Sequence, residues 1–365
     1  MLPTYLEVNL SRLEKNLAAI RSYVHPAKVM VVLKANAYGH GVEGVAPFIA
    51  SKADYLGVAL VEEAIHLRRL GIESPILVMG GILPDQLPAF FEDHLTLAAT
   101  SQMILDTAQK LEVSRDQRLK VHLKIDTGME RLGVREYEAE PFILNSIACS
   151  HLEVEGIFTH FANAEGKDQT DPRLQLDRFQ RVLSIYDKRA IPRPKLVHAA
   201  NSAAVLALPE SRFDMVRPGI LLYGVYPARD IVKPIKVLPA IKWKSRVVHS
   251  KVTRPERPVG YGSLWKSRRE TRILTIPCGY ADGYFRRMST KAQVLVGGKR
   301  YPQVGRICMD QLMVNAGSED IQAGEEVVLL GDDLTVEEFS DWTGTNEYEV
   351  LTSIGARVPR SYVLE

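Results

Sequence analysis

The sequence VMVVLKANAYGHG, residues 29–41, decides the fold. Its first five residues are a continuous apolar run, which is typical of a strand buried on both faces of a parallel sheet. Seven more short β-rich runs follow before residue 225, and helical patterns such as residues 171–186 lie between most of them. Eight such units predict a (β/α)8 barrel, with an open doubly wound sheet as the alternative. No GxGxxG motif follows the first strand to support that alternative. The predicted strands are residues 29–33, 54–60, 76–79, 95–98, 119–125, 154–159, 196–199 and 213–216.

The pattern changes after a linker, residues 226–240, which contains three prolines. Beyond it, predicted strands follow one another without helices, and Gly297-Gly298 between two of them indicates a hairpin turn. Two short helices come last, with capping patterns at Thr335 and Asn346. The sequence therefore predicts an α/β barrel over residues 1–233 and a mostly β domain over residues 234–365. The strands predicted for the second domain are residues 241–253, 272–276, 292–296, 304–307, 312–315 and 326–330.

Composition excludes several classes of protein. The 365 residues include 46 basic and 44 acidic side chains, for a net charge of +2, which argues against a general nucleic-acid binder. Three widely spaced cysteines form neither a disulfide framework nor a CxxC metal pair, which favours a reducing compartment. No secretory signal and no apolar run near 18 residues is present, so we expect a cytoplasmic protein that does not span a membrane.

Several polar residues follow the predicted barrel strands, where the catalytic groups of such barrels lie. Lys34 comes directly after the first strand, and apolar neighbours would desolvate its amine and make it more nucleophilic. Lys124 and Arg131 could together bind a carboxylate. Each of these features also has an ordinary structural alternative. Lys34 could be a solvated lysine, and the segment from Lys124 to Arg131 could be an ordinary surface loop. His160, which ends a predicted strand, could be structural, and Asn201 or Ser202 could simply cap a helix. The last two strand-to-helix loops, which contain Ser202, Gly219 and Ile220, are positions where barrels commonly bind phosphate.

The run VVLKANAYGHG, residues 31–41, resembles the pyridoxal-phosphate attachment signature of alanine racemases. Further similarities occur in family order along the whole chain: KIDTGMERLGV (124–134), THFA (159–162), ANS (200–202), RPGILLYG (217–224), VGYG (259–262), GYADG (279–283), GRICMDQLM (305–313) and RVPR (357–360). The resemblance implies a pyridoxal-phosphate barrel followed by a β domain, in agreement with the pattern of predicted strands. It implies an isomerase that interconverts L- and D-alanine and supplies D-alanine for peptidoglycan.

The resemblance also implies roles for individual residues. Lys34 would bind pyridoxal 5'-phosphate covalently, and Lys34 and Tyr261 would be two bases on opposite faces of the substrate Cα. Arg217 would face the pyridine nitrogen, Lys124 would be a candidate for carbamylation, and no metal is implied. Tyr261 and its neighbours in the β domain would complete the partner's site in a homodimer. Cofactor contacts would come from Tyr38, His160, Asn201, Ser202, Arg217, Gly219, Ile220 and Tyr348, and substrate contacts from Arg131, Tyr280, Met309 and Asp310.

The sequence departs from the family pattern at a few positions. Glu130 stands where the family commonly has Gly, and Gly260 stands where Ser is common. The sequence TNEYEV replaces the usual TINYEV, so Asn346 is displaced by one position while Tyr348 keeps its spacing to Glu349. Three other functions stay open at this point: a serine or broad-specificity racemase, a decarboxylase of the same fold class, and a non-catalytic pyridoxal-phosphate-binding homeostasis protein. The second domain with Tyr261 argues against the last of these.

Overall fold

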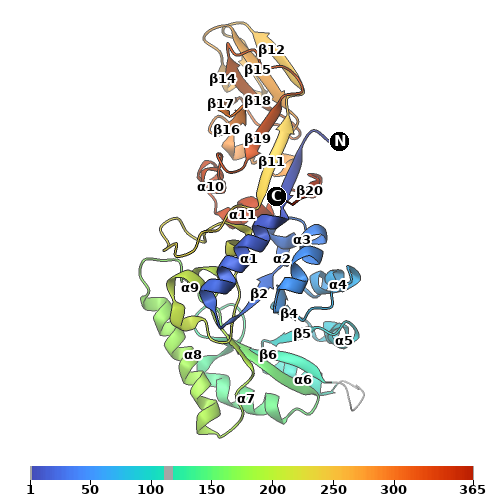
Figure 1. The fold of residues 1–365 in the computed structure, drawn as a ribbon, viewed down its shortest axis with the longest axis vertical. Helices are drawn as coiled ribbons and strands as arrows, with labels where there is room; N and C mark the ends of the chain where they lie inside the picture. Colours follow the sequence, from blue (N-terminus) through green and yellow to red (C-terminus); the bar gives the residue numbers. More distant parts are fainter. Residues whose placement is uncertain (1, 111–117, 365) are drawn as a thin grey trace. The chain divides into compact units, whose positions relative to one another are not determined.

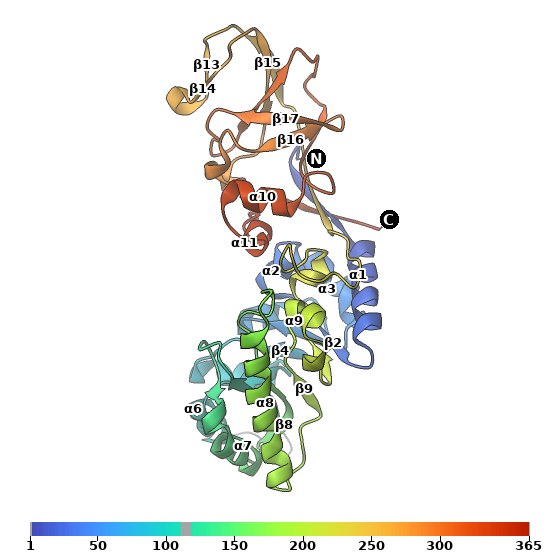
Figure 2. The same ribbon diagram turned by 90° about the vertical axis from the view of Figure 1, so that its left-hand side faces the viewer.

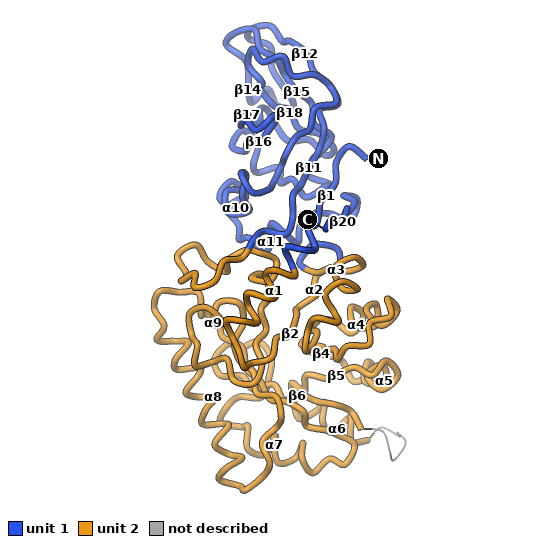
Figure 3. The backbone as a smooth tube through the Cα atoms, viewed as in Figure 1, with its two compact units in different colours: residues 1–13, 38–41, 238–365 blue, residues 14–37, 42–237 orange. Residues whose placement is uncertain are grey.

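A computed structural model describes residues 2–110 and 118–364 of the chain. The chain divides into two compact units (Figures 1 and 3). The barrel unit contains residues 14–37 and 42–237, and the β unit contains residues 1–13, 38–41 and 238–365. Each unit has its own sheet and its own core.

Eight parallel strands close into a barrel in the barrel unit, which confirms the predicted fold. β2 pairs with both β3 and β10, and β5 pairs with both β4 and β6, so the sheet has no open edge among these eight strands. The predicted alternative, an open sheet, is therefore wrong. The barrel strands are β2 (Lys28–Val32), β3 (Tyr55–Val58), β4 (Ile76–Val78), β5 (Thr96–Ala99), β6 (Leu119–Asp126), β8 (Leu152–Phe158), β9 (Leu196–His198) and β10 (Met215–Val216), and the short β7 (Val134–Arg135) pairs with β6 outside the ring.

Large side chains fill the barrel interior, as closed eight-stranded barrels require. Helices cover the outside, so most strand residues are buried on both faces, and this explains why the strands read as unbroken apolar runs. The interior cluster consists of Met30, Tyr55, Leu77, Ala98, Phe158, Leu196 and Met215.

The helix α8 (Thr170–Lys188) shows how the outer layer is held. Its buried residues include Leu176, Phe179 and Leu183, spaced three and four apart on one helix face. Burial of each such side chain contributes about 1.5–3 kcal/mol. The other helices of this unit are α1 (Leu10–Val24, whose first turn belongs to the β unit), α3 (Val42–Ile49), α4 (Val61–Arg69), α5 (Leu87–Glu92), α6 (Gln102–Lys110), α7 (Ala139–Ala148) and α9 (Ser202–Ala207).

The β unit is built on one sheet in the order β12-β15-β18-β17-β16-β19-β11-β1-β20. The N-terminal strand β1 lies between β11, which is antiparallel to it, and β20, which is parallel. Sequence analysis did not anticipate β1. The strands of this sheet are β1 (Tyr5–Asn9), β11 (Ile241–Arg246), β12 (His249–Thr253), β15 (Thr271–Ile276), β16 (Gln293–Val296), β17 (Lys299–Val304), β18 (Leu312–Gly317), β19 (Glu326–Leu330) and β20 (Arg360–Val363), and β13 (Pro258–Val259) pairs with β14 (Trp265–Lys266) separately.

Two strand predictions in this unit need correction. Residues 241–253 are two strands, since β11 pairs with β1 and β19 whereas β12 pairs with β15. The strand predicted over residues 304–307 is wrong, because β17 ends at Val304 and Gly305 turns away with φ +70°. A Cβ at Gly305 would lie 2.4 Å from the Val259 carbonyl oxygen, so only glycine fits this close approach.

The predicted turn and caps of the β unit are confirmed. Val296 pairs with Lys299, so Gly297 and Gly298 form a two-residue hairpin turn with φ of +57° and +76°. Thr335 caps α10 (Val336–Thr343) in a capping box with Glu338. Asn346 caps α11 (Glu347–Thr352) by accepting from the Glu349 amide at 2.9 Å. Figure 2 shows the two helices side by side.

Candidate active site

Lys34 stands where strand β2 gives way to a left-handed turn. The turn α2 (Lys34–Tyr38) has φ of 53° at Ala35, 54° at Asn36 and 52° at Ala37 and Tyr38. Each L-residue in this region costs roughly 1–2 kcal/mol, and consecutive ones are rare. Strain of this kind is found mainly at functional sites, where the surrounding structure holds it.

Two side chains hold this turn. Glu63, in the first turn of α4, accepts from the Ala35 amide at 2.7 Å with one oxygen and from the Ala59 amide at 2.8 Å with the other. Asn36 accepts from the Val42 amide at 2.7 Å. Sequence analysis missed Glu63, because a carboxylate in the first turn of a helix has an ordinary role there. Its bond to residue 35 depends on the pairing of β2 with β3.

The barrel unit has a pocket of about 240 Å³ in which five residues predicted from the sequence come together. Its lining contains four basic side chains and no acidic one. An apolar wall that includes Phe158 completes it. Such a pocket suits an anionic ligand, because no carboxylate in its lining offsets the positive charge. The predicted residues in it are Lys34, Lys124, Arg131, His160 and Arg217.

Burial and mutual repulsion favour neutral forms of the amines and the imidazole. Burial, followed by the charge of Arg131, lowers the pKa of Lys34. Burial and the charge of Arg217 hold the pKa of Lys124 well below its usual range. The same two causes hold the pKa of His160 well below its usual range. A neutral amine is the nucleophilic and basic form, so this pocket activates its lysines.

The guanidinium of Arg217 is fixed by a set of acceptors. It donates to the carbonyls of Thr159 at 2.8 Å and Ala199 at 2.9 Å, to His198 Nδ1 at 2.9 Å and to His160 Nδ1 at 3.3 Å. Burial lowers its pKa, but the intrinsic basicity of arginine keeps it charged at neutral pH. The structure thus presents a fixed cation to the pocket.

Asp126 shapes the loop that carries Arg131. Its carboxylate accepts from the amides of Gly128 at 2.8 Å, Met129 at 2.9 Å and Arg131 at 3.2 Å. Burial would raise the pKa of Asp126, but these backbone donors together lower it. Glu130 lies in this loop with φ +52°, which explains why glycine suits the position. The loop keeps its left-handed turn with Glu130, whose carboxylate pairs with Arg135 at 2.9 Å.

The last two strand-to-helix loops are tied together by a hydroxyl. Ser202, the first residue of α9, accepts from the Gly219 amide at 2.8 Å and the Leu221 amide at 3.3 Å. Asn201 caps α9 by accepting from the Ala204 amide at 3.0 Å, as its capping interpretation predicted. Ile220 begins the 3-10 helix Ile220–Tyr223. This corner therefore brings Ser202, Gly219 and Ile220 together.

The β unit has a separate hollow of about 690 Å³, lined by Tyr261, Tyr280, Met309 and Asp310. The Tyr280 and Ala281 amides donate to the carbonyls of Cys308 and Met309, both at 3.0 Å, which places Tyr280 beside Met309. Tyr261 is 72% exposed. The four residues predicted for this domain's contribution to a site are thus neighbours on one open surface.

Tyr38 and Tyr348, the two predicted cofactor contacts in the β unit, also lie close together. Their ring centroids are 6.2 Å apart. Burial raises the pKa of Tyr38, so its hydroxyl stays protonated and can donate a hydrogen bond.

A closed eight-stranded barrel with an activated lysine at the end of its first strand, joined to a β unit, defines a class of two-domain barrel enzymes. The chain matches the N-terminal domain of alanine racemases over residues 8–227 and their C-terminal domain over residues 240–362. It therefore belongs to the alanine racemase family.

Named relatives and solved structures agree with this family. An alanine racemase of Carboxydothermus hydrogenoformans is 42% identical, with both chains covered completely. The structure of an alanine racemase from Clostridium difficile superimposes with a TM-score of 0.94 at 35% identity, covering 100% of this chain and 96% of the other. An alanine racemase of Bacillus anthracis with bound L-Ala-P gives a TM-score of 0.92 at 34% identity, with coverages of 100% and 95%. Across residues 2–110 and 118–364, no helix has both the length and the apolar character to cross a membrane.

Proposed function

We propose that this protein interconverts L-alanine and D-alanine with pyridoxal 5'-phosphate, and so supplies D-alanine for peptidoglycan. One observation carries the proposal: Lys34 lies in a cationic pocket whose lining contains no carboxylate, and burial lowers the pKa of its amine. The family membership of the whole chain supports the same activity. In this proposal residues 1–233 bind the cofactor, and residues 234–365 complete a site.

The donor set of the barrel pocket fits the cofactor. A neutral lysine amine can condense with an aldehyde, and arginine suits a bound ring nitrogen or an anionic group. Lys34 would hold the cofactor covalently, and Arg217 would face its ring nitrogen, with His160 as the neighbour of Arg217. The phosphate would lie against Tyr38, Ser202, Gly219, Ile220 and Tyr348. Asn201 would be a further contact of the cofactor. When bound, pyridoxal phosphate delocalises the electron pair left at the substrate Cα.

The residues of the chain would move the protons. Racemisation removes a proton from one face of Cα and returns one to the other, so it needs two groups on opposite faces. Lys34 would serve one face, because burial favours its neutral amine. Tyr261 would serve the other, and each positioned base would contribute roughly 10²- to 10⁴-fold.

The exposure of Tyr261 supports a shared site. A phenol that is 72% exposed is available to a second copy of the chain. In the proposed homodimer, Tyr261, Tyr280, Met309 and Asp310 of one chain complete the barrel pocket of the other. Arg131 and Met309 would hold the substrate carboxylate, and Asp310 would be a further residue of the substrate site. Tyr348 and Tyr280 would narrow the entrance and favour a small side chain such as methyl.

Lys124 would orient Arg131. Its neutral amine can add to carbon dioxide, forming a C–N bond and releasing a proton, which turns a potential cation into a carbamate anion. That anion would pair with Arg131 and offset part of the positive charge of the pocket.

A chiral assay tests the proposal. Purified protein with pyridoxal phosphate is expected to convert L-alanine to a racemic mixture, and borohydride is expected to fix the cofactor on Lys34. A panel that includes L-serine separates an alanine enzyme from a broad-specificity racemase, and an assay for released carbon dioxide tests decarboxylation. Lys34→Ala should abolish both turnover and labelling, whereas Lys28→Ala, at the exposed first residue of the preceding strand β2, should leave both unchanged. Cofactor fixed on another lysine, or no turnover of any amino acid, would overturn the proposal.

A further inference from the structure

A chain of hydrogen bonds crosses the barrel interior, starting at Arg217. Its guanidinium lies 2.9 Å from His198 Nδ1. His198 Nε2 lies 2.8 Å from His122 Nδ1, and His122 Nε2 lies 3.2 Å from Glu155 Oε2. Both imidazoles are fully buried. The chain therefore joins the wall of the cationic pocket to a carboxylate on β8.

The groups along this path can donate their hydrogen bonds in one direction only, from Arg217 towards Glu155. Arginine has only donors, so His198 Nδ1 must accept and His198 must carry its proton on Nε2. That proton points to His122 Nδ1, so His122 carries its own proton on Nε2 and donates it to Glu155. Both imidazoles are neutral in this arrangement, and no ring nitrogen is left to take a further proton. Phe158 stacks on His198 with centroids 4.7 Å apart and fixes its ring.

Strand β8 is shaped around His122. The pairing of β6 with β8 shifts between Val121, opposite Val154, and His122, opposite Gly156, so Glu155 is an extra residue in the ladder. Bulges of this kind redirect a side chain. A Cβ at Gly156 would lie 2.6 Å from His122 Nδ1, so the imidazole occupies the space that any other residue would need. The bulge and the glycine that ends it both accommodate the same imidazole.

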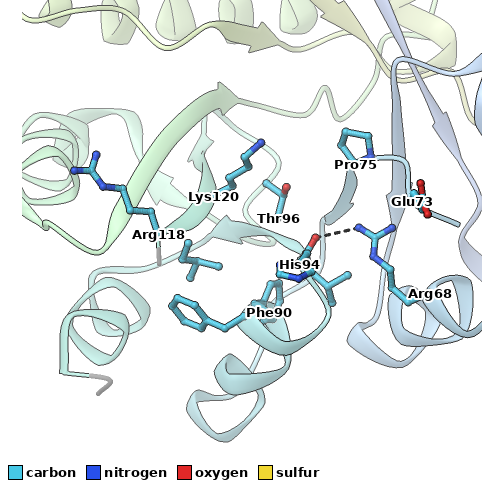
Figure 4. Close-up of a pocket in the computed structure, with 11 residues that line it drawn as sticks. Arg68, Glu73, Pro75, Phe90, His94, Thr96, Arg118 and Lys120 are labelled. Carbon is cyan, nitrogen blue, oxygen red and sulfur yellow. Dashed lines mark hydrogen bonds between the residues drawn. The ribbon is translucent and has the colours of Figure 1, made fainter. Parts of the chain in front are cut away.

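Glu155, at the far end of this hydrogen-bonded path, remains anionic. Tyr55 donates to Glu155 Oε2 at 2.8 Å, and Lys120 Nζ lies 3.5 Å from Glu155 Oε1. Burial would raise the pKa of Glu155, but the bonds from His122 and Tyr55 lower it to about 2. Lys120 and Thr96, which lies 2.5 Å from the Tyr55 hydroxyl, also line a cavity of about 260 Å³ at the amino ends of β4, β5 and β6 (Figure 4).

Arg217 lacks a nearer counter-charge. Its hydrogen-bond partners in the described chain are two imidazoles and two carbonyls, and none is a carboxylate. Burying a cation without a paired anion is costly, and polarised neutral groups can carry part of the compensation from a distance. We propose that Glu155 is a positioning residue of the racemase site, acting through His122 and His198 to fix the orientation and charge of Arg217. This inference rests on the proposed function for its kinetic consequence only.

Glu155→Gln tests the inference in the holoenzyme, because it removes the charge and keeps the shape. The kcat for alanine is expected to fall about 10- to 100-fold, the loss that is typical when the hydrogen-bond partner behind a metal-ligating histidine is removed. The KM is expected to change by less than about twofold, since the substrate carboxylate is bound by other residues in the proposal, and the absorption band of the bound cofactor is expected to shift. Glu153→Gln is the control: Glu153 lies two residues away on β8 and takes no part in the hydrogen bonds that lead to Arg217. This variant removes one carboxylate charge as well and should behave as wild type. Equal kcat and spectra in both variants would overturn the inference.

Nitrogen-15 NMR of the cofactor-free protein gives a readout that needs no activity. His122 and His198 are each expected to show one protonated Nε2 and one bare Nδ1, without titration between about pH 5 and 8. E155Q should move the Nε2–H signals of both histidines and leave that of half-buried His66, which lies outside this hydrogen-bonded path, unchanged. Titration of either buried histidine, or an unchanged His198 signal in E155Q, would refute the connection from Glu155 to Arg217 even if the protein turns over alanine. If wild type does not racemise alanine, the proposed function fails while this measurement still decides the inference. Should E155Q not fold, Tyr55→Phe removes one bond to the carboxylate and should produce the same changes at smaller amplitude.

Discussion

Replacing Ala35 by glycine should stabilise the protein, which is the opposite of what this substitution does in an ordinary helix. Ala35 is exposed and has φ 53° and ψ 53°. An L-residue pays roughly 1–2 kcal/mol in this region, whereas glycine does not. Glycine loses about 0.5–1 kcal/mol more on folding than alanine, because its unfolded chain is more flexible. The difference predicts a gain of about 0.5–1 kcal/mol for Ala35→Gly, measured as the free energy of unfolding in urea.

Ala18 supplies the matched control. It is also exposed, but it lies inside the right-handed helix α1, so Ala18→Gly should lose about 0.5–1 kcal/mol. The free energy of unfolding should therefore rise in Ala35→Gly and fall in Ala18→Gly, so that the two variants differ from each other by about 1–2 kcal/mol. If Ala35→Gly destabilises as much as Ala18→Gly, the turn after Lys34 is not strained and the reasoning fails. In the racemase assay, Ala35→Gly should also lower kcat, because a relaxed turn positions Lys34 less firmly.

Three further predictions follow from the site. Glu130→Gly should be about 0.5–1 kcal/mol more stable than Glu130→Ala in urea unfolding, since both lose the pair with Arg135 but only glycine relieves the left-handed φ; equal stability would contradict this. The pKa values of His160 and His198 lie well below the usual 6.5, so the unfolded state takes up protons first as pH falls. Stability should be fully present above about pH 6.5 and decrease below it, by up to about 1.4 kcal/mol per pH unit for each histidine, and His160→Gln should reduce that slope. Mixing inactive Lys34→Ala with inactive Tyr261→Ala should restore part of the racemase activity once subunits exchange, because one hybrid site is intact; no recovery after proven exchange would argue against a shared site.

Features that depend on local sequence could be predicted. The barrel strands were recognised because burial on both faces leaves an unbroken apolar run, as in β2. The hairpin at Gly297-Gly298 and the cap at Thr335 were recognised because two or four adjacent residues determine each of them. The pocket lysine Lys34 and the loop of Arg131 were found because both follow strand ends, which always meet at one face of a barrel.

Features that depend on strand register could not be predicted. Residues 241–253 read as one strand because nothing in their own pattern records that β11 and β12 pair with different neighbours. Glu63 reaches the Lys34 turn only because β3 lies beside β2, and its position in a helix looks ordinary without that pairing.

Glu155 is the strongest case of this limit. In the sequence LEVEGIF it is one of two glutamates on a half-buried strand, and alternation alone gives both the same status. The bulge against β6 separates them, because it turns Glu155 toward His122 while Glu153 stays in register opposite Lys120. Glu155 makes no hydrogen bond to any of the five pocket residues that were predicted from the sequence. It is nevertheless connected to one of them, Arg217, through the imidazoles of His122 and His198. The matched pair E155Q and E153Q measures whether that geometric difference, invisible in the sequence, has a functional consequence.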